Sequence, residues 1–256
     1  MAPHPSYPRT RLYVTEALKE AGEVALEGPQ AHHLLQVLRA KSGDTVALFN
    51  GRDGEWLASI TSAAKKTAVL AVQKQLRPQA PGADIWLLTA PLKGGRSEWV
   101  VEKATELGVS RICPVLTKFT IADRVNTEKL AAIAQEAAQQ CERLSLPAID
   151  PLLPLDRALT QWPEGRALIF GDESGGAGNA KDVLPTLKAS GFGVLIGPEG
   201  GFSKDELALL RSRPYVMGIS LGPRVLRADT AAVAALALVQ AFCGDWEGKP
   251  AFRSQE

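Results

Sequence analysis

Two loops of similar build, near the carboxyl end of the chain, most constrain what this sequence can fold into. The first reads Ile196-Gly197-Pro198-Glu199-Gly200-Gly201, and the second reads Leu221-Gly222-Pro223-Arg224-Val225-Leu226-Arg227. Each loop follows a short apolar run, at residues 194–196 or 216–221, and precedes a helical pattern. Short apolar runs bounded by Gly and Pro are typical of buried strands. The sequence therefore predicts strand, loop and helix twice in succession.

Glycine at a strand tip permits positive φ and lets a ligand approach the main chain closely. In open α/β sheets, ligands bind beyond the carboxyl ends of the strands, where these loops are expected to lie. One Gly-Pro loop is as readily a plain turn, but two in tandem, with a glutamate and two arginines, indicate a binding site. Ser203 and Glu206 predict a capping box after the first loop. After the second loop, Asp229 or Thr230 is expected to cap the last helix.

These loops also resemble those of a known family. The run Leu195-Ile196-Gly197-Pro198-Glu199-Gly200-Gly201-Phe202-Ser203, followed by residues 221–231, closely resembles the RsmE family. Its members are SPOUT-class enzymes that use S-adenosylmethionine to methylate N3 of a uridine in small-subunit (16S) ribosomal RNA. The family usually has Glu where this chain has Asp229. The resemblance implies that S-adenosylmethionine binds at Leu195, Ile196, Gly197, Glu199, Gly200, Gly201, Leu221, Gly222, Val225 and Leu226.

Methylation at uracil N3 requires loss of a proton and stabilisation of negative charge on the uracil oxygens. The fixed fork of arginine donors suits that role, and we predict it for Arg227. Glu199 and Asp229, the carboxylates nearest to the loops, are candidate bases. Each has an alternative, since Glu199 could orient a loop and Asp229 could cap the last helix. The sulfonium is itself the electrophile, so no metal is expected, and the three cysteines lack metal-ligand spacing.

Residues 1–75 read as a small β-rich unit, with a helix that follows Gly28-Pro29 and carries Leu34, Leu35 and Leu38 on one face. The run from His33 to Arg39 with Gly43-Asp44 resembles the PUA-like RNA-binding barrel of the same family. The predicted division is a PUA-like domain at 1–75, a linker at 76–83 and a SPOUT methyltransferase domain at 84–256. RNA contacts are expected in the first domain at Arg9, Arg11, Arg39 and Lys41.

Strands and helices alternate after residue 83, which predicts an α/β domain with a mostly parallel sheet. Ser97 is expected to cap a helix that ends before Gly108, and Thr127 a long helix that reaches about Leu144. The family resemblance implies a trefoil knot and a homodimer. It also favours RNA contacts at Lys93, Arg96 and Arg143.

The composition of the chain narrows its possible partners and location. The net charge is +1, and residues 1–80 hold 10 Lys and Arg against 7 Asp and Glu, a weak basic bias. No apolar stretch approaches the roughly 20 residues of a membrane span, and no secretory signal is apparent. No membrane partner is therefore expected, and the expected location is the cytoplasm. The family resemblance implies 16S ribosomal RNA or the small ribosomal subunit as the partner.

Three alternatives stand beside this interpretation. One is another SPOUT RNA methyltransferase, which would modify a ribose 2′-hydroxyl of tRNA or rRNA. Another is a non-catalytic RNA-binding protein with a degenerate cofactor loop, although Gly197, Gly200, Gly201 and Gly222 are intact. The third is a nucleotide-dependent α/β enzyme, although the glycine-rich loop at 171–178 matches neither a dinucleotide fingerprint nor a P-loop.

Overall fold

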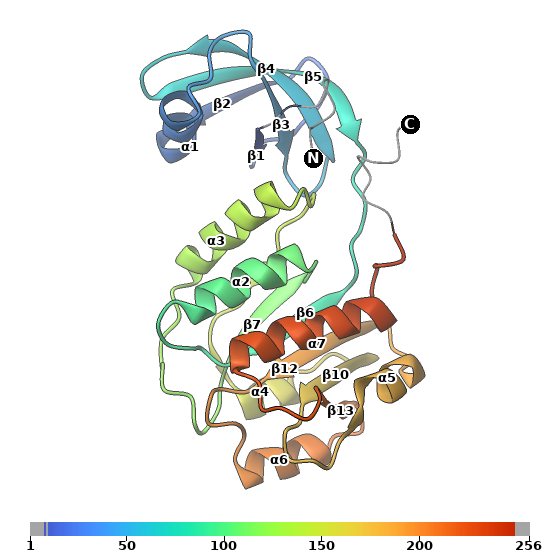
Figure 1. The fold of residues 1–256 in the computed structure, drawn as a ribbon. Helices are drawn as coiled ribbons and strands as arrows, with labels where there is room; N and C mark the ends of the chain where they lie inside the picture. Colours follow the sequence, from blue (N-terminus) through green and yellow to red (C-terminus); the bar gives the residue numbers. More distant parts are fainter. Residues whose placement is uncertain (1–7, 9, 249–256) are drawn as a thin grey trace. The chain divides into compact units, whose positions relative to one another are not determined.

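The protein was analysed as a computed structural model that describes residue 8 and residues 10–248 (Figure 1). Arg9, one of the predicted RNA contacts, lies outside the described residues. The chain forms two compact units. Within the described residues, the first unit runs as far as Pro81 and also contains Ala138–Leu146, and the second unit holds Gly82–Ala137 and the chain from Pro147 onward. The first unit is therefore built from two separate segments of sequence, whereas the sequence predicted a contiguous one.

The first unit is a curled five-stranded sheet with the strand order β1-β3-β4-β5-β2. Only the β1–β3 pair is parallel. Three register shifts interrupt the pairing of β4 with β5, and such bulges bend a sheet and increase its twist. The strands are β1 (Arg11–Tyr13), β2 (Glu23–Glu27), β3 (Thr45–Phe49), β4 (Glu55–Ala63) and β5 (Thr67–Arg77). β5 thus runs two residues into the stretch predicted as a linker.

One helical segment follows β2. It begins as α1 (Gly28–His32) and continues as a π-helical turn at His33–Val37. Leu34 is fully buried in the core of this unit, but Leu38 is 44% exposed. The wider π-helical turn changes the angle between successive side chains, so the predicted apolar face does not extend to Leu38.

Arg11 makes its contacts inside this unit. It is buried, forms an ion pair with Glu55, and lies 4.4 Å from the centre of the Phe49 ring. Its guanidinium also donates to the carbonyl groups of Ala138, Gln139 and Arg143. These bonds engage the Arg11 donors inside the protein, so the structure contradicts the predicted RNA contact at Arg11.

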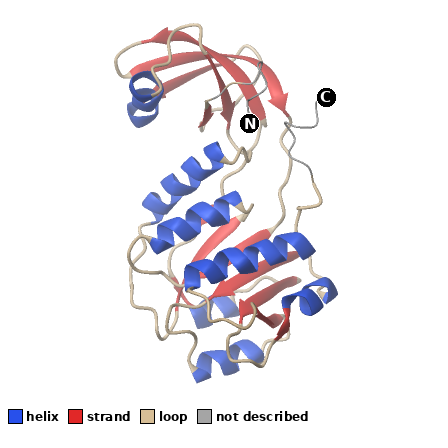
Figure 2. Ribbon diagram, viewed as in Figure 1, coloured by secondary structure: helices blue, strands red, loops and turns tan. Residues whose placement is uncertain are grey.

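The second unit is organised around a parallel sheet with the order β11-β13-β10-β12-β6-β7-β8, and β9 also pairs with β7 (Figure 2). Every strand pair in it is parallel. The predicted mostly parallel α/β sheet is therefore confirmed. The strands are β6 (Ile85–Thr89), β7 (Arg111–Leu116), β8 (Ala148–Ile149), β9 (Leu153–Pro154), β10 (Arg166–Gly171), β11 (Gly178–Asn179), β12 (Gly191–Ile196) and β13 (Val216–Ser220).

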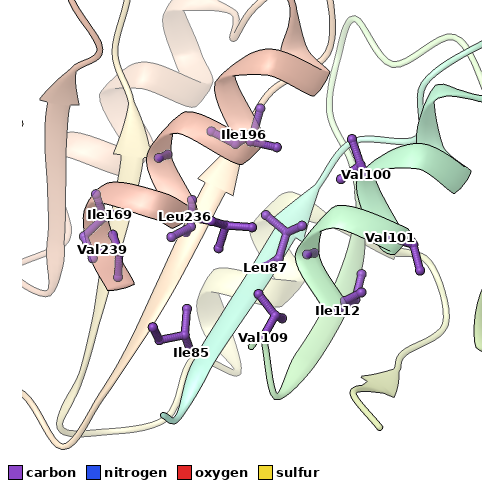
Figure 3. Close-up of a cluster of buried hydrophobic side chains, with 14 of the residues drawn as sticks. Ile85, Leu87, Val100, Val101, Val109, Ile112, Ile169, Ile196, Leu236 and Val239 are labelled. Carbon is purple, nitrogen blue, oxygen red and sulfur yellow. The ribbon is translucent and has the colours of Figure 1, made fainter. Parts of the chain in front are cut away.

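Helices cover both faces of this sheet. On one face, Leu87 and Ile112 of neighbouring strands pack with Val101 of α2 and Leu236 of α7 (Figure 3). On the other face, alternate strand residues such as Leu88 pack with the helices α4 and α6. Alternation along each strand sends successive apolar side chains to opposite layers, which explains why the strands read as continuous apolar runs. The helices are α2 (Arg96–Glu106), α3 (Thr127–Gln140), α4 (Leu155–Thr160), α5 (Ala180–Val183), α6 (Lys204–Arg211) and α7 (Ala228–Cys243), with a 3-10 turn at Leu184–Thr186.

Several helix ends differ from their predictions. Ser97 does not cap α2, because its hydroxyl bonds to the N–H and the carbonyl of Leu92, and Gly95 occupies the cap position. The helix α3 ends at Gln140, before the predicted Leu144. The capping box of Ser203 and Glu206 is confirmed. The described residues contain no helix that is long and apolar enough to cross a membrane. The trefoil knot stays a prediction.

Candidate active site

A cavity of about 670 Å³ lies at the carboxyl ends of three neighbouring strands, β13, β10 and β12. Parallel strands end at the same edge of the sheet, so the loops that follow them meet there. Both predicted Gly-Pro loops line the cavity, and a third loop from β10 completes it. The lining residues are Gly171, Asp172, Glu173, Ser174, Gly175, Ile196, Gly197, Pro198, Glu199, Gly201, Phe202, Leu207, Ser220, Leu221, Gly222, Pro223, Arg224, Val225, Leu226, Arg227, Ala228 and Ala231.

The structure brings most of the predicted cofactor residues to this cavity. Ile196, Gly197, Glu199, Gly201, Leu221, Gly222, Val225 and Leu226 all line it. Two others lie elsewhere. Leu195 is fully buried among the side chains that pack against α4 and α6. Gly200 lies outside the lining, and a Cβ added to it would stand 3.0 Å from the Cβ of Phe119.

The loop after β10 is the part of the site that the sequence did not predict. Asp172 is buried there and accepts hydrogen bonds from the Ser174 N–H at 2.9 Å and from Arg211 Nη2 at 2.8 Å. Burial alone would raise the pKa of the Asp172 carboxyl. The hydrogen bonds from Ser174 and the Arg211 guanidinium outweigh burial and hold that pKa below its ordinary value. Asp172 is therefore a charged anchor for its loop.

Glu173 and Gly201 bring two of the loops into close approach. Gly201 has φ of +68°, and a Cβ added to it would stand 2.8 Å from a carboxylate oxygen of Glu173. Glu173 is itself exposed and lines the cavity. Glycine at position 201 thus provides both the left-handed backbone and the space for the neighbouring carboxylate.

Glu199 lines the cavity and forms a 3.0 Å ion pair with Arg96, at the start of α2. The sequence assigned these residues to different tasks, Glu199 to catalysis and cofactor binding and Arg96 to RNA. The ion pair joins the loop after β12 to the first residue of α2. This geometry favours the alternative in which Glu199 orients its loop.

Arg227 and Asp229 lie at the start of α7, but only Arg227 lines the cavity. The predicted cap at Asp229 or Thr230 is wrong, because the helix begins at Ala228 and Arg227 occupies the cap position. Asp229 instead lies in the first turn, where its Oδ1 accepts from the Thr230 N–H at 2.8 Å. A carboxylate there also stabilises the positive end of the helix dipole. Arg227 makes no side-chain capping bond, and its side chain is exposed.

The remaining predicted RNA contacts are in different environments. Arg39, Lys41 and Lys93 are exposed. Arg39 also has φ of +55°, in the left-handed region, directly after the π-helical turn. Arg143 is half-buried, donates to the Ser145 hydroxyl at 3.3 Å, and its carbonyl accepts from Arg11.

Comparison with known proteins agrees with this geometry. A family model described as an RNA methyltransferase domain matches residues 78–240, and one described as an RNA methyltransferase PUA domain matches residues 26–73. A relative from Rickettsia conorii, ribosomal RNA small subunit methyltransferase E, is 33% identical over 90% of this chain and 94% of its own length. The chain belongs to the ribosomal RNA small subunit methyltransferase E family. The expected resemblance to the RsmE family is thereby confirmed.

Solved structures of the methyltransferase E family and its relatives share the fold. The crystal structure of a ribosomal RNA small subunit methyltransferase E from Neisseria gonorrhoeae, bound to S-adenosyl methionine, superposes with a TM-score of 0.85. It is 26% identical, and the match covers 93% of this chain and 99% of that one. A Legionella pneumophila methyltransferase in complex with the bound cofactor SAM gives a TM-score of 0.83 at 31% identity, over 92% and 98% of the two chains. The expected class, an α/β methyltransferase fold preceded by a PUA domain, is confirmed.

Proposed function

We propose that this protein transfers a methyl group from S-adenosylmethionine to N3 of a uridine in 16S ribosomal RNA. One observation carries the proposal. In a chain of the methyltransferase E family, three adjacent strand-tip loops enclose a cavity of about 670 Å³ lined by glycine backbone, apolar side chains and two exposed arginines, Arg224 and Arg227. Cavities of about 300–1,000 Å³ are typical of small-molecule sites.

The residues of the cavity fit S-adenosylmethionine. Leu221, Leu226 and Ile196 supply apolar surface for an adenine ring, and the glycine-containing loops expose main-chain groups for its polar edge. Glu173, whose carboxylate lies beside Gly201, supplies negative charge that complements the sulfonium and ammonium groups. When bound, the cofactor supplies an electrophilic methyl group.

Arg227 is the proposed catalytic residue. Its side chain reaches the cavity from the start of α7 without a capping bond, so its donors remain available for a substrate. As N3 loses its proton, negative charge spreads onto the uracil oxygens, and a guanidinium placed beside them stabilises that charge. Glu199 and Asp229 are weaker candidates for the base, because Glu199 binds Arg96 and Asp229 binds the Thr230 N–H.

Recognition of RNA is proposed for exposed basic residues of both units. Arg39 and Lys41 would bind phosphate groups from the PUA domain, and Lys93 would do so beside the start of α2. Arg96 and Arg143 are kept as secondary contacts, because both already bind protein groups. Arg11 is excluded because it is buried.

A homodimer is also proposed. The helix α7 is apolar along most of its length, yet Phe242 in its last turn is 45% exposed. A helix with so little polar surface needs packing partners on most sides, and a second subunit would supply one for Phe242. Light scattering at micromolar concentration should give twice the chain mass, and a fully active monomer would exclude the dimer.

Nucleoside analysis tests the activity. Small ribosomal subunits that lack the modification are incubated with the protein and S-adenosylmethionine, and their 16S RNA is digested to nucleosides. N3-methyluridine is the expected product. A 2′-O-methylated nucleoside would favour the alternative SPOUT activity, and no product despite measured cofactor binding would overturn the proposal. Free 16S RNA, assayed in parallel, shows whether the assembled subunit is the substrate.

A further inference from the structure

One exposed aromatic residue lies directly behind the wall of the cavity. Glu199 and Gly201 line the cavity, and Gly200 between them does not. The space where a Gly200 side chain would lie is occupied by Phe119, whose Cβ and Cγ stand 3.0 and 3.5 Å from the position of an added Cβ. Phe119 nevertheless remains 45% exposed. The wall between the cavity and this exposed ring is therefore a single stretch of glycine backbone.

The turn that carries Phe119 is firmly held. Thr117 and Thr120 close it, with a bond from the Thr120 N–H to the Thr117 carbonyl at 3.1 Å and one from the Thr117 N–H to Thr120 Oγ1 at 2.9 Å. The Lys118 N–H also donates to Glu206 Oε1 at 2.8 Å, which ties the turn to the first turn of α6. Because hydrogen bonds fix the backbone of this turn, little backbone freedom is lost when a ligand binds to it.

Two exposed basic residues lie close to Phe119 in sequence. Lys118 is the next residue, and Arg124 lies in the same loop, each exposed, with the exposed Asp123 beside them. Arg96, on the far side of Glu199, is balanced by that carboxylate. The neighbour Ile121 is 64% exposed and extends the apolar surface. An exposed aromatic ring and exposed basic residues in one loop are features that bind single-stranded RNA, with phosphates on the cations and a base on the ring.

We propose that Phe119 is the platform on which the target uracil stacks after it leaves the RNA helix. This proposal rests on the proposed function, because a base modified on its pairing edge must leave the stack. N3 lies in the plane of the ring, at that edge. Stacking on Phe119 occupies one face of the uracil and leaves the pairing edge free beside the loop that carries Glu199 and Gly201, both of which line the cavity. Phe119 is therefore a substrate-positioning residue, and Lys118 supports it by binding the adjoining phosphate.

Three substitutions separate stacking from simple packing against Gly200. Phe119→Ala removes both, Phe119→Leu keeps apolar packing without an aromatic face, and Phe119→Trp keeps the face. The measurements are single-turnover methylation of small ribosomal subunits over a range of subunit concentrations, and S-adenosylmethionine affinity by calorimetry. Phe119→Ala and Phe119→Leu should both lower the ratio of maximal rate to half-saturating concentration by about 5- to 150-fold, the range for one lost base stack. Phe119→Trp should retain most of it, and cofactor affinity should not change in any variant.

A matched control is Trp246→Ala. Trp246 is 50% exposed and follows Asp245, whose carboxylate binds the Ala83 N–H ahead of β6, at the opposite edge of the sheet. This variant should methylate at the wild-type rate. Full activity of Phe119→Ala, or full rescue by Phe119→Leu, would overturn the proposal while the proposed function stands. A wild-type protein that forms no N3-methyluridine would overturn the proposed function and this proposal together.

Discussion

Glu199 Oε1 and Arg96 Nη2 form an ion pair at 3.0 Å, and each side chain is about one-third exposed, at 34% and 33%. Partly exposed pairs of this kind contribute about 0–1 kcal/mol to stability. The importance of the pair is therefore geometric. It fixes the loop after β12, which lines the cavity, to the amino end of α2.

The first prediction follows from that geometry. Glu199→Gln and Arg96→Ala should each weaken S-adenosylmethionine binding by up to about 5-fold, and the double variant should be no weaker than either single one, because both remove one interaction. Calorimetry on the three variants measures this. If Glu199 were the base, Glu199→Gln alone would lower the single-turnover rate by about 10²–10⁴ while Arg96→Ala retained most activity.

Arg227→Ala should lower the single-turnover rate of methylation by about 10²–10³, the usual effect of losing one positioned donor, with cofactor affinity little changed. Arg227→Lys should recover only part of the rate, because a point charge does not reproduce the guanidinium fork. Thermal stability should stay near that of the wild type, since Arg227 makes no capping bond. Parallel losses of rate, cofactor affinity and melting temperature would show that Arg227 only supports the loop.

Two adjacent glycines should behave differently. Gly201→Ala places a side chain at φ of +68° and against the Glu173 carboxylate, a strain of about 1–2 kcal/mol on a loop that lines the cavity. We expect S-adenosylmethionine affinity to fall by about 5- to 30-fold. Gly200→Ala should change that affinity much less, because its new methyl group meets Phe119. Calorimetry on the two variants tests this, and equal losses would contradict it.

Glu55 should be essential to the stability of the first unit. It is fully buried and binds both Arg11 and Arg77. Glu55→Gln leaves two largely buried guanidinium groups without their counter-charge, and removing one partner of a buried ion pair typically costs about 3–5 kcal/mol. Urea unfolding measures the loss, and hydrogen exchange should place it in β4 and β5. The exposed Glu106, which binds Lys103, is the control, and Glu106→Gln should change stability by less than about 1 kcal/mol.

Asp172 predicts a specific dependence of stability on pH. Its pKa is lower in the folded protein than the ordinary value of 3.8, so its ionised form stabilises the fold above that value. The contribution is lost as pH falls through the lowered folded pKa. Asp172→Asn should therefore cost about 1–3 kcal/mol at pH 7, and the difference from wild type should shrink below about pH 4. A difference that stays constant from pH 7 to pH 3 would contradict this assignment.

The elements that local pattern determines were predicted well. The apolar runs before the two Gly-Pro loops lie at the end of β12 and along β13, and the capping box of Ser203 and Glu206 starts α6 as expected. Predictions failed where tertiary contacts override local pattern. The π-helical turn at His33–Val37 changes the angular spacing of the side chains, so Leu38 does not lie on the buried face as predicted. Ser97 bonds to the backbone of Leu92 instead of capping α2.

Only part of the site was predicted, because the rest depends on tertiary structure that local pattern does not show. Two of its loops carry their own signal, the repeated Gly-Pro pattern, but the third depends on strand order. The loop after β10 reaches the cavity because β10 lies between β12 and β13, although it precedes both in sequence. A glycine-rich stretch with acidic residues after an apolar run was the available signal. Arg11 was predicted to contact RNA because it lies in a mildly basic segment, but it is buried in an ion pair with Glu55.

Because the first unit is built from two segments of sequence, it cannot be exchanged between relatives as one amino-terminal piece. Arg11 and Arg77 bind carbonyl groups of Ala138, Gln139, Glu142 and Arg143, which reach that unit from more than fifty residues farther along the chain. A domain exchange that cuts only between residues 77 and 83 would separate these partners. Chimeras between relatives should therefore transplant residues 138–146 together with the amino-terminal segment. Inheritance of the PUA domain is thus linked to a stretch that lies within the methyltransferase domain in sequence.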